Sequence, residues 1–206
     1  MKELAKTFQQ SLRELGMERL VHPVFYNAPI GLRFEIGDPE LPVYLKGGAN
    51  PNYLKKALER TTALFHALPE AWDILRFDCF TENNKKGIRS FRAASALPAS
   101  EEVVCDVYEQ DRPMIESYWR IDSTAFVDRL FAAIIYADIG GNQEELTSSV
   151  HLMNTRNNVL FHLYDDRGLD IVGGDKGQLY PLFQDFNDWI LDYDRERIGK
   201  IFSACT

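Results

Sequence analysis

The chain of 206 residues has no run of about 18 consecutive apolar residues, so its sequence predicts no transmembrane helix. Charged side chains interrupt the apolar pattern of the first twenty residues, whereas a secretory signal peptide needs an uninterrupted apolar region there. We therefore expect a cytoplasmic protein that does not bind membranes.

Cysteines are few, and basic residues are outnumbered by acidic ones. Cys79, Cys105 and Cys205 are widely spaced, so they indicate neither a disulfide framework nor a zinc knuckle. Cys79 and Cys105 lie in apolar runs, where a buried free thiol is commoner than a catalytic one. The chain has 23 Lys and Arg against 31 Asp and Glu, and its pI is about 5.1. Nucleic acid is therefore not an expected partner, because phosphates are bound by clustered Lys and Arg.

Motifs of known catalytic or metal sites are also missing. The glycine-rich segment 173–177 lacks the Lys-Ser/Thr ending of a P-loop, and neither GxSxG nor HExxH occurs. The four histidines, His22, His66, His151 and His162, include no close ligand pair. His151 and His162 could meet across adjacent strands, but two core or edge histidines are commoner than a metal pair. We therefore expect no catalytic residue, no metal site and no cofactor, and a protein that is not an enzyme.

Helical and strand patterns follow one another in a mixed order. Apolar residues at spacings near four predict a helix over residues 4–15 that ends at Gly16, and Asn50 caps a second helix over 51–68. Asp122 or Ser123 can cap a third helix, which the glycines at 140 and 141 close. Strand patterns occupy residues 31–37, 72–80, 103–109, 114–122, 149–154 and 159–166. These patterns predict a single α+β domain over residues 1–206, with a mixed or antiparallel sheet flanked by helices, a C-terminal hairpin and two C-terminal helices.

The C-terminal hairpin contains the first group of candidate site residues. Asp165, Asp166, Arg167 and Gly168 separate two strand patterns, as expected for a turn in which aspartates accept from nearby amides and Gly168 adopts a positive φ. Alternatively, Asp165, Asp166 and Asp170, together with His162, bind a hard cation or act as acid and base groups. Turn chemistry accounts for Asp165, Asp166 and Gly168 without any ligand.

The second group lies on the next predicted helix. Between Asp165 and Asp194 the chain has eight aspartates against two basic residues. Asp175 is placed to cap the helix, and Asp185, Asp188 and Asp192 fall opposite its apolar stripe, with no basic residue four positions away. Such a ridge is either a solvated face or a surface suited to a basic protein.

Several segments together resemble a known family. They are LRFEIG, YLKKALERTTALFHAL, WRID and the long stretch LFHLYDDRGLDIVGGDKGQLYPLFQDFNDWILDYDRERI. They resemble the bacterial domain of unknown function number 3885, over about residues 31–202 and most specifically at 164–168 and 187–194. The resemblance implies a single-domain cytoplasmic protein and brings no catalytic residues with it. It also implies an association with toxin-immunity gene clusters, in which some members occur.

Two function hypotheses follow. The first is an immunity protein that neutralises a cognate basic toxin, or another basic protein, by direct contact; electrostatic steering would accelerate its association. Its contact set would be Tyr164, Asp165, Asp166, Asp170, Asp185, Asp188 and Asp192. The second is a small metal-dependent hydrolase that uses the C-terminal aspartates with His162. An inhibitor's aspartates should face outward over a broad surface, whereas those of an enzyme should converge on one point in a pocket.

Overall fold

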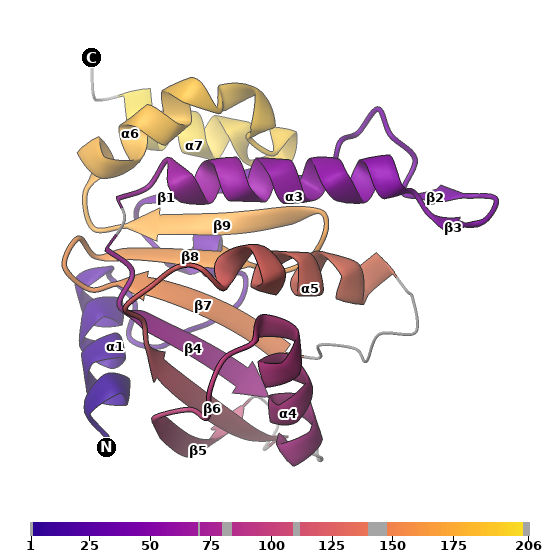
Figure 1. Cartoon of the computed structure of the whole chain (residues 1–206). Helices are drawn as coiled ribbons and strands as arrows, with labels where there is room; N and C mark the ends of the chain where they lie inside the picture. Colours follow the sequence, from indigo (N-terminus) through magenta and orange to yellow (C-terminus); the bar gives the residue numbers. More distant parts are fainter. Residues whose placement is uncertain (1, 70, 80–83, 109–111, 140–147, 204–206) are drawn as a thin grey trace.

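A seven-stranded sheet forms the centre of the structure (Figure 1). The computed structural model describes residues 2–69, 71–79, 84–108, 112–139 and 148–203. In hydrogen-bonded order the strands are β1 (Gly31–Glu35), β9 (Gly168–Gly173), β8 (Val159–Leu163), β7 (Ser148–Asn154), β4 (Ile74–Cys79), β6 (Arg112–Arg120) and β5 (Glu102–Tyr108). Each neighbouring pair is antiparallel. The predicted α+β class is confirmed, and the sheet is antiparallel rather than mixed.

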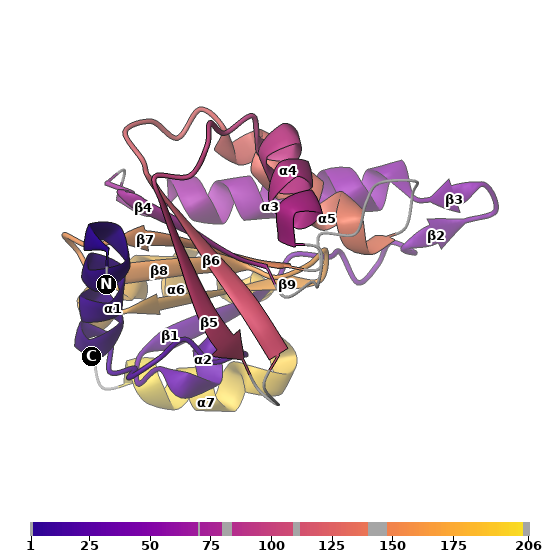
Figure 2. The ribbon, with the colours of Figure 1, turned by 90° about the horizontal axis from the view of Figure 1, so that it is seen from below.

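Three helices cover one face of this sheet (Figure 2). They are α3 (Pro51–His66), α4 (Asn84–Ser95) and α5 (Val127–Ile139). The core beneath them is aromatic: the Phe65 ring stacks on Trp72 at 5.1 Å and meets the edges of Phe131 and Phe161. The predicted start of α3 is confirmed, because the Asn50 side chain accepts the N–H of Asn52.

The opposite face carries α1 (Glu3–Glu14) and the short α2 (Val24–Asn27) (Figure 2). The apolar side of α1 packs on a row of strand residues that face each other across four strands: Ile74, Met153, Leu160 and Val172. As predicted, the helix ends next to Gly16, whose φ is +80°. This apolar row occupies only part of the face. The rest is polar, and His22 lies just before α2.

The C-terminal elements lie beside β1 and β9 (Figure 1). They are α6 (Lys176–Asp185), the 3-10 turns η2 (Asn187–Trp189) and η3 (Asp192–Asp194), and α7 (Arg195–Phe202). Asp175 caps α6 as predicted, by accepting the N–H of Gly177. The predicted continuation of this helix to residue 192 is wrong. The chain leaves the helix after Asp185 because Ile190 forms a bridge to Phe34, and Leu191 donates its N–H to the carbonyl of Arg33 on the edge strand β1.

Some elements were not predicted from the sequence. They include α2, α4 and the small hairpin of β2 (Tyr44–Leu45) and β3 (Gly48–Ala49). Cys79 is buried as expected, but Cys105 is exposed because β5 is an edge strand. Cys205 and the glycines predicted to end α5 lie outside the described residues. Among the helices that are described, none combines the length and the apolar character that crossing a membrane requires.

Candidate functional site

The sheet face that carries α1 and α2 has a row of polar side chains, one from each of the seven strands. The residues are matched by strand register, except that His151 and His162 are related by ring stacking, with centroids 4.6 Å apart. All but the two end members are almost fully buried. We call this set the polar row; from β1 to β5 it consists of Arg33, Asp170, His162, His151, Arg76, Tyr118 and Glu102.

Arg76 is the centre of a buried ion cluster. Its guanidinium donates to Asp78 Oδ1 at 2.6 Å and lies 2.8 Å from Glu116 Oε1. The Tyr118 hydroxyl donates to Glu116 Oε2 at 2.5 Å, so both carboxylates are held in place. Burial raises the pKa of the Asp78 carboxyl to about 6, although the Arg76 charge opposes this shift. Burial also raises the pKa of the Tyr118 hydroxyl.

Arg33 forms a similar cluster at the other end of the row. Its Nε lies 3.4 Å from Asp170 Oδ1 and 4.0 Å from Asp194 Oδ2. The guanidinium stacks over the rings of Tyr26 and Tyr164, 5.2 and 5.1 Å from their centroids. Asp170 also accepts the N–H of Phe25 at 3.1 Å, which ties α2 to the sheet. Burial raises the pKa of the Asp170 carboxyl to about 6.

Three histidines lie between the two arginine clusters. The ring of His22 lies 4.7 Å from that of His162 and 5.2 Å from that of His151. Each ring offers one nitrogen, and these three nitrogens lie within 4.8 Å of one another. Such a grouping could hold a metal ion. Burial lowers the pKa of His22 to about 4 and the pKa values of the other two well below their usual range. We call these residues the histidine cluster.

Among the residues that the structure describes, the ring nitrogens of the two fully buried histidines have no hydrogen-bond partner. This is true of Nδ1 and Nε2 of His151 and also of Nδ1 and Nε2 of His162. Oδ2 of Asp78 lies 3.9 Å from His151 Nδ1. Buried polar atoms are normally satisfied, so four such atoms in one place call for a ligand or ordered water. The sequence suggested that His151 and His162 could meet, and they do, but it gave no sign that His22 joins them.

The hairpin aspartates among the predicted contact residues are buried. Asp165 Oδ1 accepts the N–H groups of Arg167 and Gly168, which confirms the predicted hydrogen bonds of the turn, whereas the φ of Gly168 is not positive as predicted. Asp166 Oδ2 accepts the hydroxyl of Tyr53 at 2.8 Å. Asp170 belongs to the buried polar row, and Tyr164 is half-buried against Arg33. These aspartates therefore stabilise the fold, each through a different partner.

The other predicted residues face solvent. Asp185, Asp188 and Asp192 are exposed, at the end of α6, in η2 and in η3 respectively. They do not share one helix face as predicted. Tyr193, which directly follows Asp192, is 86 % exposed. We call residues 185–193 the acidic segment.

The alternation that produces the polar row is visible in the sequence, but it does not distinguish a buried face from an exposed one. Strand residues 76–78 and 116–118 read Arg-Phe-Asp and Glu-Ser-Tyr, with charged side chains on one face of strands whose other face is apolar. Exposed strands have the same alternation, because one face of an antiparallel sheet commonly meets water. Only the cover provided by the N-terminal segment distinguishes this face as buried.

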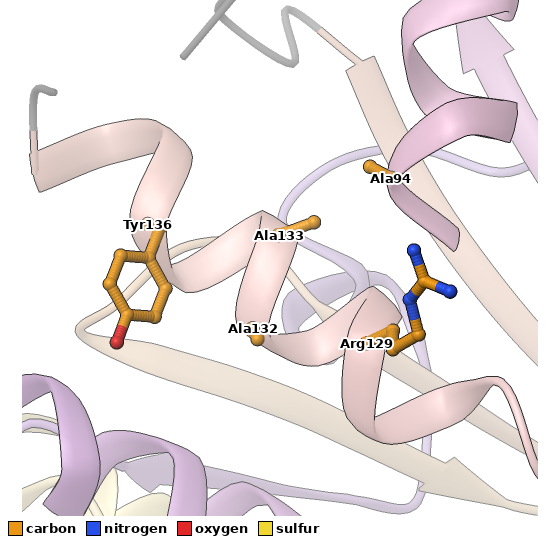
Figure 3. Close-up of a pocket in the computed structure, with 5 residues that line it drawn as sticks. All are labelled: Ala94, Arg129, Ala132, Ala133 and Tyr136. Carbon is orange, nitrogen blue, oxygen red and sulfur yellow. The ribbon is translucent and has the colours of Figure 1, made fainter. Parts of the chain in front are cut away.

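A surface hollow between α4 and α5 is a weaker candidate (Figure 3). It has a volume of about 350 Å³ and is lined by Ala94, Arg129, Ala132, Ala133 and Tyr136. Arg129 points toward Ala94 on α4 (Figure 3). This lining contains no carboxylate, histidine or thiol, so it offers no metal ligand set.

Comparison with known proteins places the chain in a family. The family described as "Domain of unknown function (DUF3885)" matches residues 8–194, which include the histidine cluster and the polar row. The chain is also 32 % identical over 44 residues to the uncharacterized protein YnaE of Bacillus subtilis (strain 168), a match that spans 21 % of each chain. No solved structure matches it. Because the family match extends over most of its length, the chain belongs to the DUF3885 family.

Proposed function

We propose that this protein binds a basic partner protein through its acidic segment, and that it acts as an immunity protein by neutralising a bacterial toxin domain. The observation that carries the proposal is the solvent exposure of Asp185, Asp188 and Asp192 next to the almost fully exposed Tyr193. Carboxylates accelerate association with a cationic surface, and an exposed aromatic ring can fill a pocket at the centre of an interface.

The carboxylates of the acidic segment are available for a partner. In the part of the chain that the structure describes, Asp185 and Asp188 have no ion-pair partner. Asp192 pairs with Arg195 at 3.1 Å, but Asp192 is 95 % exposed, so this pair contributes little stability and can be exchanged for a partner's cation. A toxin that acts on nucleic acid would present such cations in its active-site cleft.

The alternative proposal is a hydrolase that uses the C-terminal aspartates with His162. It would need these carboxylates to converge on one point, as groups that share a substrate or metal do. Asp165, Asp166 and Asp170 are instead engaged by Arg167, Tyr53 and Arg33. Partner binding by the acidic segment therefore ranks first.

The test compares the wild type with the triple variant Asp185→Asn, Asp188→Asn, Asp192→Asn, which removes three charges and retains side-chain size. The product of the adjacent gene serves as the test partner, and association is followed by stopped flow at several salt concentrations. At low salt we expect the association rate constant to fall about tenfold or more, with a smaller change in dissociation. For the wild type, raising the salt should produce the same slowing, because the Debye length falls below about 10 Å above 0.1 M salt.

A matched control removes the same charge from other elements. Glu14, Glu18 and Glu59 are all exposed, and their joint substitution by Gln changes the net charge equally. This control should associate at nearly the wild-type rate. Equal slowing of both variants would mean that net charge, not this surface, drives association. A triple variant as fast as the wild type at low salt would show the acidic segment to be only a solvated face.

A further inference from the structure

We propose that His22, His151 and His162 together bind one divalent transition-metal ion of the zinc class, between the sheet and the segment that precedes α2. The site is separate from the acidic segment and does not depend on the partner-binding proposal. It is assembled from three parts of the chain: β7, β8 and the connection between α1 and α2, which runs across this face of the sheet (Figure 2).

The spacing of the histidine nitrogens is close to that of a zinc site. The candidate ligand nitrogens lie within 4.8 Å of one another. Nitrogens bound to zinc at about 2.0–2.1 Å in a tetrahedral arrangement lie about 3.4 Å apart. Rotations of the imidazole rings that bring these nitrogens up to about 1.4 Å closer would close the site. Imidazole suits zinc, copper, nickel and iron, whereas the hard cations Mg²⁺ and Ca²⁺ prefer oxygen ligands.

Both buried imidazoles lack hydrogen-bond partners within the described part of the chain. His151 and His162 are at most 2 % exposed, and all four of their ring nitrogens are without a partner. A metal ion would engage one nitrogen of each ring. For His151, the other nitrogen could then be Nδ1, whose N–H would face Asp78 Oδ2, now 3.9 Å away. A carboxylate in that place fixes the tautomer and orientation of a metal-bound histidine.

The charges beside the histidine cluster favour a cation. Arg76 is paired with Asp78 and Glu116, and Arg33 with Asp170 and Asp194. Two guanidinium groups therefore face four carboxylates, which formally leaves two negative charges in these clusters on either side of the histidines. A divalent cation would balance them. The two arginines repel a bound cation less strongly than free guanidinium groups would, because each one already has two anionic neighbours.

His22 gives an ion access to the site. It is the half-buried member of the cluster, whereas the other two lie under the cover of the N-terminal segment. It also lies outside the sheet, so His22→Ala should leave the fold intact. The chain has one further histidine, His66, which is exposed on α3 and provides a matched control.

The experiment uses the full chain purified without a polyhistidine tag and stripped of metal with a chelator. Zn²⁺ binding is measured by calorimetric titration and metal analysis, and Co²⁺ is used as an optical probe of tetrahedral coordination. We expect one Zn²⁺ per chain and a midpoint of thermal unfolding that rises with Zn²⁺ but not with Mg²⁺. His22→Ala should bind Zn²⁺ about 100-fold more weakly or not at all, and His66→Ala should bind it like the wild type.

Two results would overturn the inference. One is the absence of saturable binding of Zn²⁺ or Co²⁺ to the wild type. The other is wild-type affinity in His22→Ala, with unchanged circular dichroism, because the ion would then be held elsewhere. Imidazole nitrogen chemical shifts provide a direct readout that needs no variant: those of His22, His151 and His162 should shift on Zn²⁺ addition, whereas those of His66 should not. Neither outcome depends on a partner protein, so failure here leaves the partner-binding proposal untouched.

Discussion

Gly168 is the position where one added methyl group should reveal most about the hairpin. Its φ lies outside the left-handed region, so the positive φ expected from the sequence is wrong. The structure requires glycine there for a different reason. A Cβ atom would overlap the Tyr164 hydroxyl and lie 2.7 Å from the carbonyl oxygen of Phe34. That carbonyl belongs to β1, which pairs with β9 at this point, so it cannot withdraw without disturbing the ladder.

The expected cost of Gly168→Ala follows from these contacts. Overpacking of a well-packed site costs about 1–3 kcal/mol. Displacement of Tyr164 also lengthens the 3.3 Å hydrogen bond that it accepts from Arg33, and a hydrogen bond contributes about 1 kcal/mol. We expect a loss of about 3 kcal/mol, or about 6–12 °C in the unfolding midpoint of a domain of this size. Chemical and thermal unfolding followed by circular dichroism measure both quantities.

Two further variants isolate the cause. Tyr164→Phe removes the colliding hydroxyl, so Gly168→Ala should cost about 1 kcal/mol less in that background. The Phe34 carbonyl oxygen at 2.7 Å and the ring carbon Cζ of residue 164 at 2.8 Å account for the remainder. Gly47→Ala is the control: no atom lies within 4 Å of its added Cβ, and its change should stay within about 0.5 kcal/mol. If Gly168→Ala were as mild as Gly47→Ala, the close approach would be refuted. An equal loss in both Tyr164 backgrounds would show that the hydroxyl is not the obstacle.

Two more predictions concern buried charge. Asp166→Ala should lower the free energy of unfolding by about 1–3 kcal/mol, because it removes the carboxylate that accepts from the buried Tyr53 hydroxyl at 2.8 Å and leaves that hydroxyl the carbonyl oxygen of residue 166 at 3.5 Å. Exposed Asp188→Ala should change it by less than about 0.5 kcal/mol. Urea unfolding compares the two, and equal values would contradict the structural role of Asp166. In chelator-treated protein, stability should rise between about pH 4 and pH 6.5. The three clustered histidines have lowered pKa values, so in this window they take up protons mainly on unfolding, and their contribution is lost as the pH falls. Asp78 and Asp170, with pKa values raised to about 6, act in the opposite direction, since their contribution is lost as the pH rises. Three histidines against two aspartates leave a net rise, and a curve that falls across this window would show that the carboxylates dominate.

Local features were readable from the sequence because they depend on nearby residues. The apolar period of residues 4–15, the cap formed by Asn50 and the Asp165 turn all involve partners within a few positions, and all three are confirmed. The helix predicted through residue 192 failed where a distant strand intervened: Leu191 bonds to Arg33 on β1, far away in the sequence. Local periodicity carries no information about such a partner.

The sequence by itself determined the class of the fold, the positions of most strands and helices, and the exposure of Asp185, Asp188 and Asp192. The tertiary structure alone decided that Asp166 and Asp170 are buried, that Arg33 and Arg76 each meet two carboxylates, and that His22 joins two histidines more than 120 positions away. The reason is physical. Alternation along a strand fixes which residues share a face, but whether that face meets water or the protein depends on where the chain returns to cover it. Here α1 packs on Arg76 and Tyr118, His22 of the connection on the two strand histidines, and α2 on Asp170, so the face is a buried cluster of charges and histidines.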